Sequence, residues 1–193
     1  MTRGLEQIPW LYDACMALAE RTGLGRWRAW LAGGATGRTL DLGCGTGRNL
    51  PFYRRGAAVG LDPHPDNLAA ARRRAPVPLV RARAEALPFK DGAFETVVGG
   101  LVLCSVDDPA AALAELRRVL APGGALRLLE HVRSTRPWEA RLQDWLQPVW
   151  TRLSGGCHPN RDTEAAVLAA GFRILPEGRR ARGTLRRFAA QRD

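Results

Sequence analysis

A glycine-rich turn directly after a short apolar strand is the feature that most constrains how this chain folds. Residues 39–42 predict a buried strand, and Gly43, Gly45 and Gly47 follow it at alternate positions. Glycine lacks a Cβ atom, so a ligand can approach the backbone of such a turn closely. A helix expected from about Arg48 would add free N–H groups and the positive end of its dipole. The segment predicts an α/β fold with a ligand site after its first strand.

The side chains of this turn argue against a phosphate ligand. A dinucleotide fingerprint needs a third glycine where Arg48 stands, and no Gly-Lys-Ser/Thr follows the turn. Asp41 precedes the first glycine, and a carboxylate there repels pyrophosphate but suits an ammonium or a sulfonium. Cys44, inside the turn, is expected to be a small filling residue rather than a nucleophile. A cationic ligand therefore fits the turn better than a phosphate does.

Short apolar runs alternate with amphipathic segments along the chain. Further strands are expected at residues 58–61, 77–80, 96–104 and 125–129, with a final hairpin of 172–175 and 185–189. Helices are expected at 5–32, from Pro65 or Asp66 onward, and at 110–120, 138–153 and 163–170. On the last but one of these, Trp145 and Trp150 are expected to pack the helix against the body. The alternation predicts a mostly parallel sheet covered on both faces.

Length and composition are those of one globular domain spanning residues 1–193. The longest uncharged run in the middle of the chain, Thr96 to Val106, is far shorter than the roughly 20 residues of a membrane span. The first residues contain no apolar stretch of the signal-peptide kind. A cytoplasmic location is therefore expected.

The cysteines are spaced too widely to predict a disulfide framework or a metal site. Cys15, Cys44, Cys104 and Cys157 are separated by 29, 60 and 53 positions, with no C-x-x-C pair. The three histidines, at positions 64, 131 and 158, show no metal-ligand spacing either. Reduced thiols and no metal are expected.

The chain is strongly basic, with a formal net charge of +10, and Lys90 is the single lysine among 29 basic residues. A solvated basic surface explains this balance better than a dedicated polyanion site. Phe188 is the one aromatic residue among the arginines near the C-terminus, which leaves little stacking surface for single-stranded nucleic acid. Nucleic acid is therefore not an expected partner.

Asp62 ends the second expected strand, 15 residues beyond Gly47. A carboxylate at this position can accept hydrogen bonds from both hydroxyls of a ribose. A turn aspartate beside Pro63 is the alternative, and the preceding glycine turn favours the ribose role.

Four motifs in this order resemble those of class I S-adenosylmethionine-dependent methyltransferases: Asp41-x-Gly43-x-Gly45-x-Gly47, Asp62, Glu85-Ala86-Leu87-Pro88-Phe89 and Pro122-Gly123-Gly124. The resemblance implies a three-layer Rossmann-like α/β fold with a mostly parallel sheet, an antiparallel C-terminal strand and an N-terminal helical lid. The lid would span residues 1–35 and the cofactor-binding core residues 36–132. Residues 133–193 would supply the acceptor-side helices and the final hairpin.

The same resemblance implies roles for individual residues toward S-adenosylmethionine, whose product is S-adenosylhomocysteine. The loop from Gly43 through Cys44 and Gly45 to Gly47 would wrap the methionine part behind Asp41, and Asp62 with Pro63 would hold the ribose. Ala84, Glu85 and Ala86 would flank the adenine, and Leu101 would pack on it. Arg83 stands where many relatives carry an aspartate that contacts the adenine amine.

A narrower resemblance covers the second half of the chain. Val102-Leu103-Cys104-Ser105-Val106, Leu129-Glu130-His131-Val132, Trp145 through Trp150 and Gly156-Cys157-His158-x-x-Arg161-x-Thr163 are similar to the methyltransferase-like alkyl thiol S-methyltransferases. The resemblance implies that a small thiol or sulfide accepts the methyl group. His131 and His158 are the candidate bases or thiolate stabilisers, with a structural histidine at a strand end and an exposed loop residue as the respective alternatives. The candidate acceptor-side residues are Tyr12, Cys104, Ser105, Trp150 and Arg161. For Arg161, attraction of an anionic acceptor and pairing with a nearby carboxylate are both open.

Other acceptors remain open at this stage. A phospholipid amine, a quinone ring or a small natural product would suit the same framework, and peripheral membrane contact is compatible with the basic surface. An RNA-associated methyltransferase is the alternative from another class, and the chain contains no Asn/Asp-Pro-Pro-aromatic motif for amine methylation of bases.

Overall fold

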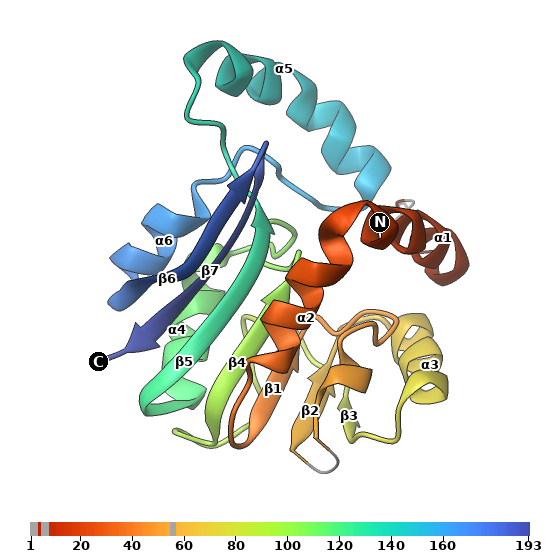
Figure 1. Ribbon diagram of the computed structural model, residues 1–193, viewed down its shortest axis with the longest axis vertical. Coiled ribbons are helices and arrows are strands. Elements are labelled where there is room, and N and C mark those ends of the chain that lie inside the picture. Colours follow the sequence, from red (N-terminus) through yellow and green to blue (C-terminus); the bar gives the residue numbers. More distant parts are fainter. Residues whose placement is uncertain (1–3, 5–7, 55–56) are drawn as a thin grey trace.

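A seven-stranded sheet forms the centre of the protein in its computed structural model, which describes residues 4, 8–54 and 57–193. The strand order is β3-β2-β1-β4-β5-β7-β6 (Figure 1). The strands are β1 Thr39–Leu42, β2 Ala58–Leu61, β3 Leu79–Val80, β4 Phe94–Gly100, β5 Leu120–His131, β6 Phe172–Arg182 and β7 Leu185–Arg192. The helices are α1 Pro9–Ala19, α2 Gly25–Gly33, α3 Pro65–Arg74, α4 Pro109–Val119, α5 Pro137–Ser154 and α6 Thr163–Ala169.

The directions of the strands confirm the expected topology. Strand β1 pairs in parallel with β2 and β4, and β4 pairs in parallel with β5. Strand β7 runs antiparallel to both of its neighbours, β5 and β6. The sheet is therefore mostly parallel with one antiparallel C-terminal strand.

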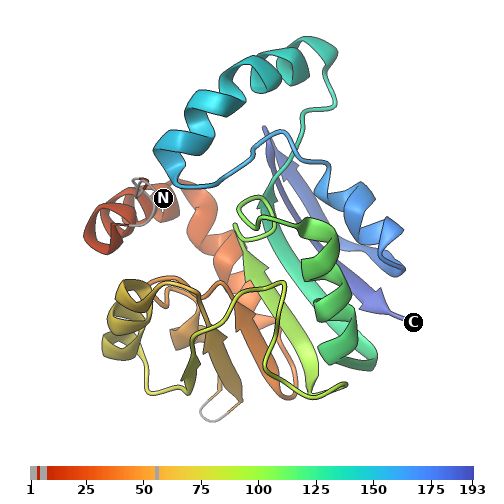
Figure 2. The same cartoon turned by 180° about the vertical axis from the view of Figure 1, so that it is seen from behind.

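Helices cover both faces of this sheet because its central strands are apolar on both sides. Val97 and Val98 follow each other on β4, and both are fully buried. Val98 shares a core cluster with Leu31 of α2, and Val97 shares another with Leu116 of α4 and Val167 of α6. Figure 2, which views the molecule from behind, shows α4 and α6 on the face opposite to α2. The three-layer arrangement is confirmed.

The helix expected from Arg48 is wrong. The chain instead makes turns after Gly47 and one short 3₁₀ segment, Leu50–Phe52. Pro51 lies within this stretch, and proline inside a helix removes a backbone donor and clashes with the preceding turn. The expected helix at 5–32 forms as α1 and α2 joined by a π-helical turn, Glu20–Leu24, and its residues 5–7 lie outside the described ones.

The expected packing of Trp145 against the body is also wrong, whereas the half-exposed Trp150 contacts the buried Cys157 with its side chain. Trp145 is 76% exposed and Trp150 45% exposed, and the neighbouring apolar side chains of α5 are exposed as well. Periodicity predicts an apolar face but not what covers it, and α5 extends beyond the sheet (Figure 1). Within the described part of the chain, no helix has the length and apolar character needed to cross a membrane.

Candidate functional site

A cavity of about 280 Å³ opens at the carboxyl ends of β1, β2 and β4. In parallel α/β sheets, ligands bind at this edge, where the chain leaves the strands. Half of the residues predicted for the site line the cavity: Tyr12, Gly43, Gly45, Asp62, Pro63, Ala84, Glu85, Leu101 and Ser105. These residues come from α1, from the glycine turn and from the loops after β2, β3 and β4.

The other predicted residues are not in the cavity wall: Asp41, Cys44, Gly47, Ala86, Cys104, His131, Trp150, His158 and Arg161. Three of them, Cys44, Ala86 and Cys104, lie directly behind it, because their chain neighbours line the cavity. The structure therefore separates residues that can contact a ligand from residues that support them.

The surroundings that a Cβ atom would meet differ among the three glycines of the turn. All three have positive φ angles, 56° at Gly43, 55° at Gly45 and 84° at Gly47. A Cβ atom would lie 2.5 Å from Val102 at Gly43 and 2.9 Å from Ala71 at Gly47, so packing excludes side chains there. At Gly45 a Cβ atom would meet no other residue closer than 4.0 Å. Gly45 is thus the position where the missing side chain leaves space for a ligand.

Asp62 holds the glycine turn against the loop after β2. Its Oδ2 accepts a hydrogen bond from the backbone N–H of Gly45 at 3.0 Å, and its Oδ1 accepts from His64 N–H at 2.9 Å and Asn67 Nδ2 at 3.2 Å. Burial raises the pKa of this carboxyl, and these donors oppose the rise. A carboxylate offers about four acceptor positions, so room remains for one direct ribose hydrogen bond rather than two.

Asp41 lies beneath the turn and not in the cavity. Its side chain is fully buried, and Oδ1 accepts a hydrogen bond from Asn49 Nδ2 at 2.8 Å. Oδ2 is also buried, and the buried Tyr53 hydroxyl acts on the same carboxyl. Burial raises the pKa of Asp41 to about 7, although Asn49 opposes this. The predicted direct role of Asp41 toward a cationic ligand gives way to a role in supporting the turn.

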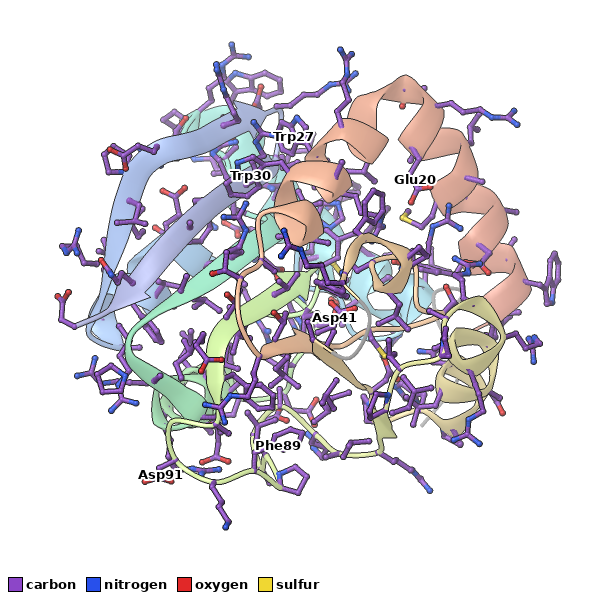
Figure 3. All side chains as sticks on the ribbon, turned by 60° about the horizontal axis from the view of Figure 1, so that its bottom comes forward. Glu20, Trp27, Trp30, Asp41, Phe89 and Asp91 are labelled. Carbon is purple, nitrogen blue, oxygen red and sulfur yellow. The ribbon has the colours of Figure 1, made fainter. Side chains whose placement is uncertain are left out.

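A buried polar network connects Asp41 to the N-terminal helices. Asn49 accepts a hydrogen bond from Arg28 Nη1 at 2.6 Å, and Arg28 Nε donates to Glu20 at 2.8 Å. Arg48, on the glycine turn, pairs with the same Glu20 carboxylate. Figure 3 shows Glu20 on the N-terminal helical segment and Asp41 in the interior. The network fixes the segment that joins α1 and α2 to the glycine turn.

The loop after β4 forms the opposite wall of the cavity and is held by one buried carboxylate. Glu130, at the end of β5, accepts hydrogen bonds from the backbone N–H groups of Val102, Leu103 and Cys104 at 2.9, 3.0 and 3.1 Å. Burial raises the pKa of Glu130, and these three donors oppose the rise. The loop begins at Leu101, whose φ of 62° is unusual for a residue with a branched side chain. Sequence reasoning did not assign Glu130 a role, because its partners are 26 to 28 positions away.

Arg161 holds the loop after β4 through hydrogen bonds to the backbone carbonyl groups of that loop. Its Nη1 donates to the backbone oxygens of Leu103 at 2.7 Å and Val106 at 2.8 Å. Neither of the two predicted partners, an anionic acceptor or a carboxylate, is needed to explain the residue. Arg161 is thus a positioning residue for the acceptor-side wall.

Replacing Arg161 by methionine is expected to destabilise the protein by about 3 kcal/mol, because each hydrogen bond from a charged donor contributes roughly 1.5–3 kcal/mol. Urea unfolding of the two proteins measures the difference. The exposed Arg152 of α5 offers a control, and Arg152→Met is expected to change the free energy of unfolding by less than about 0.5 kcal/mol. Equal stabilities of both variants would contradict the positioning role.

Three potential metal-binding or acid–base side chains meet behind this loop. The ligand atoms of Cys104, His131 and Cys157 all lie within 4.8 Å of one another. Cys157 Sγ is 3.7 Å from His131 Nδ1, and both cysteines are buried. His158 is directed elsewhere: its backbone N–H donates to Cys104 O at 2.7 Å, and its Nδ1 is 2.7 Å from Gly156 O. The wide spacing in sequence concealed this cluster.

At the other end of the cavity, Arg83 occupies the place of the aspartate expected from the family. Its guanidinium pairs with Glu85 and Asp107, and Glu85 Oε1 also accepts a hydrogen bond from the Asp107 backbone N–H at 3.0 Å. Arg83 therefore ties the adenine-side loop to the loop after β4.

Comparisons with known proteins agree with this geometry. The family model described as "Methyltransferase domain" matches residues 40–128. Thiol S-methyltransferase TMT1B of Rattus norvegicus is 38% identical over 69% of this chain, and the match covers 59% of that protein. Thiol S-methyltransferase TMT1A of Homo sapiens is 37% identical over 70% of this chain and 60% of its own length. A SAM-dependent methyltransferase from Thermotoga maritima has the same fold, with a TM-score of 0.67, 22% identity and coverage of 94% of this chain and 98% of that one.

The chain spans about 60% of the length of these thiol S-methyltransferases. Residues 40–128 contain the glycine turn, Asp62 and the loops that line the cavity. By its fold, its cavity and these similarities, the chain is a class I S-adenosylmethionine-dependent methyltransferase that resembles the thiol S-methyltransferases.

Proposed function

We propose that the protein transfers a methyl group from S-adenosylmethionine to the sulfur of a small thiol or sulfide. The observation that carries this proposal is the similarity to proteins named thiol S-methyltransferases over more than two thirds of the chain. The cavity supports it, because Leu101, Val102 and Val106 line it with apolar side chains. Such a lining suits an uncharged acceptor.

The cofactor side of the cavity fits S-adenosylmethionine. Gly45 leaves open space against the backbone, and Asp62 retains an acceptor position for a ribose hydroxyl. Ala84, Glu85 and Leu101 line the part proposed for the adenine. The bound cofactor supplies a methyl group on a sulfonium, which is already activated for transfer. The protein then has to place the acceptor in line with that methyl group.

The acceptor side needs only modest chemical help. A thiol of pKa about 8.5 is a few per cent thiolate at pH 7, and the thiolate is the nucleophile. His131 and His158 are the proposed bases, and both lie behind the cavity wall rather than in it. Ser105 and Tyr12 supply hydroxyl groups in the wall itself, and they are proposed to orient the acceptor.

Purified protein is expected to release S-adenosylhomocysteine when supplied with S-adenosylmethionine and a panel of alkyl, aryl and inorganic sulfur nucleophiles. Turnover should rise with pH until the acceptor thiol is ionised, because the fraction of reactive thiolate rises with pH. Oxygen analogues of the same acceptors serve as controls and are expected to give no turnover. No product from any sulfur acceptor would overturn the proposed function.

A phospholipid amine is the second candidate acceptor, and the surface of α5 favours it. Trp138, Trp145, Val149 and Leu153 are each more than half exposed, and tryptophan is enriched where proteins meet the membrane interface. Vesicles containing phosphatidylethanolamine are therefore assayed in parallel with the thiols. Turnover on vesicles alone would move the protein to lipid methylation, and turnover on thiols alone would leave α5 without a catalytic role.

A further inference from the structure

The Cys104, His131 and Cys157 side chains come from three separate parts of the fold. Cys104 lies in the loop after β4, His131 ends β5, and Cys157 lies in the loop after α5. The backbone around them is fixed independently of the three side chains. Glu130 accepts the Cys104 backbone N–H, Ser154 Oγ accepts the Cys157 backbone N–H at 3.1 Å, and Thr151 Oγ1 donates to Cys157 O at 2.9 Å. The cluster is thus held in place before any ligand binds.

The distances within the cluster match those of a tetrahedral zinc site. Zinc–sulfur and zinc–nitrogen bonds of about 2.3 and 2.05 Å at a tetrahedral angle place the two ligand atoms about 3.6 Å apart. The observed distance from Cys157 Sγ to His131 Nδ1 is 3.7 Å. All three ligand atoms lie within 4.8 Å of one another, so a small movement of the side chains brings them to one ion.

The chemistry of the cluster selects a soft divalent ion. Two thiolates and one imidazole are the ligand types that favour zinc over magnesium or calcium.

We propose that Cys104, His131 and Cys157 bind one Zn²⁺ ion whose fourth coordination position takes the sulfur of the methyl acceptor. Ser105 and Gly156, the chain neighbours of the two cysteines, both line the cavity, so the ion lies directly behind its acceptor-side wall. Catalytic zinc sites have three protein ligands and a fourth position for water or substrate, and this cluster supplies three ligands. His131 is then a ligand rather than a base.

The second half of the proposal, the role of the ion in methyl transfer, rests on the proposed thiol acceptor. A thiol that binds zinc loses its proton to solvent, so a thiolate is present at neutral pH without a general base. The thiolate sulfur forms a bond to the methyl carbon, and the bond from that carbon to the sulfonium breaks. The electron pair of the broken bond stays on S-adenosylhomocysteine, and a thioether leaves the zinc.

The metal content of reduced protein tests the first half without any activity assay. Protein reloaded with Zn²⁺ and passed through a desalting column is expected to hold one equivalent of zinc by mass spectrometry. Cys104→Ser and Cys157→Ser are each expected to weaken zinc binding at least 100-fold in competition with a chromogenic chelator. Cys15→Ser, at an exposed cysteine, is the matched control and should bind zinc like the parent protein. Equal zinc binding by all four proteins, or none by the parent, would overturn the site.

Cobalt substitution tests the second half and keeps the proposal testable if a serine variant fails to fold. Co²⁺ in the parent protein is expected to show a thiolate charge-transfer absorption, and adding a thiol acceptor should change that spectrum. A Co²⁺ spectrum that does not respond to any thiol would overturn acceptor ligation. Undiminished thiol methylation by metal-free protein would also overturn it while leaving the proposed function intact, whereas a bound ion with no thiol turnover would count against the proposed function alone.

Discussion

Gly45→Arg is expected to abolish measurable binding of S-adenosylmethionine, with an affinity loss of at least 100-fold. A Cβ atom at this position points into open space beside the cavity, so the arginine side chain would occupy the volume proposed for the cofactor. The backbone N–H of Gly45 also donates to Asp62, which connects the turn to the proposed ribose position. Isothermal titration calorimetry of the variant with S-adenosylmethionine measures the loss.

An arginine substitution at Gly183 is a control for Gly45→Arg, because the two glycines have similar positive φ angles. The φ of Gly183 is 57°, close to the 55° of Gly45, and a Cβ atom added there would meet nothing within 4 Å. Gly183→Arg places the same side chain in the turn between β6 and β7, away from the cavity. It should lose a similar amount of stability and keep its affinity. If both variants bound S-adenosylmethionine like the parent protein, the cofactor would not lie against Gly45.

Local sequence signals predicted which side chains meet at the carboxyl edge of the sheet. The glycine turn and Asp62 each follow a strand directly, and the parallel sheet brings the ends of those strands to one edge. Sequence could not distinguish Gly45 from Gly43 and Gly47, however. The neighbours that exclude a Cβ atom at those two positions are Val102 and Ala71, which lie far away along the chain.

The acceptor side depends on contacts that no local pattern contains. Arg161 reaches Leu103 and Val106 from more than 50 positions away, and Glu130 reaches the same loop from the neighbouring strand. The cluster of Cys104, His131 and Cys157 arises in the same way. Composition and spacing alone therefore predicted no metal site, although the residues for one are present. The residue types can be read from the sequence, but the contacts between residues that are far apart along the chain cannot.

The α5 helix shows a different limit of sequence reasoning. Its apolar periodicity predicted a helix correctly, but the pattern was interpreted as packing against the body. In the fold this face is exposed, with Trp138 at 64% and Trp145 at 76%. The apolar periodicity predicts that one face of the helix is apolar. It does not predict whether protein or membrane covers that face.

Asp41→Asn is expected to remove a large part of the pH dependence of stability between pH 4 and pH 7. Folding raises the pKa of Asp41 to about 7 through burial, so the folded state keeps a proton that the unfolded chain loses near pH 4. Between these two pH values, the free energy of unfolding then falls by about 1.4 kcal/mol per pH unit, or about 4 kcal/mol in total. The contribution is fully present below pH 4 and lost above pH 7. Asparagine has no proton to lose, so the variant should gain on the parent protein as pH rises.

Urea unfolding of both proteins from pH 4.5 to pH 8 measures this difference directly. Subtracting the two curves cancels the contributions of Asp62 and Glu130, whose pKa values burial also raises. Asp91, a surface carboxylate that is 81% exposed (Figure 3), provides the control, and Asp91→Asn should leave the slope unchanged. Parallel curves for Asp41→Asn and the parent protein would mean that Asp41 is already ionised in the folded state at pH 5. The charge of Arg28, which reaches Asp41 through Asn49, would then outweigh the cost of burial.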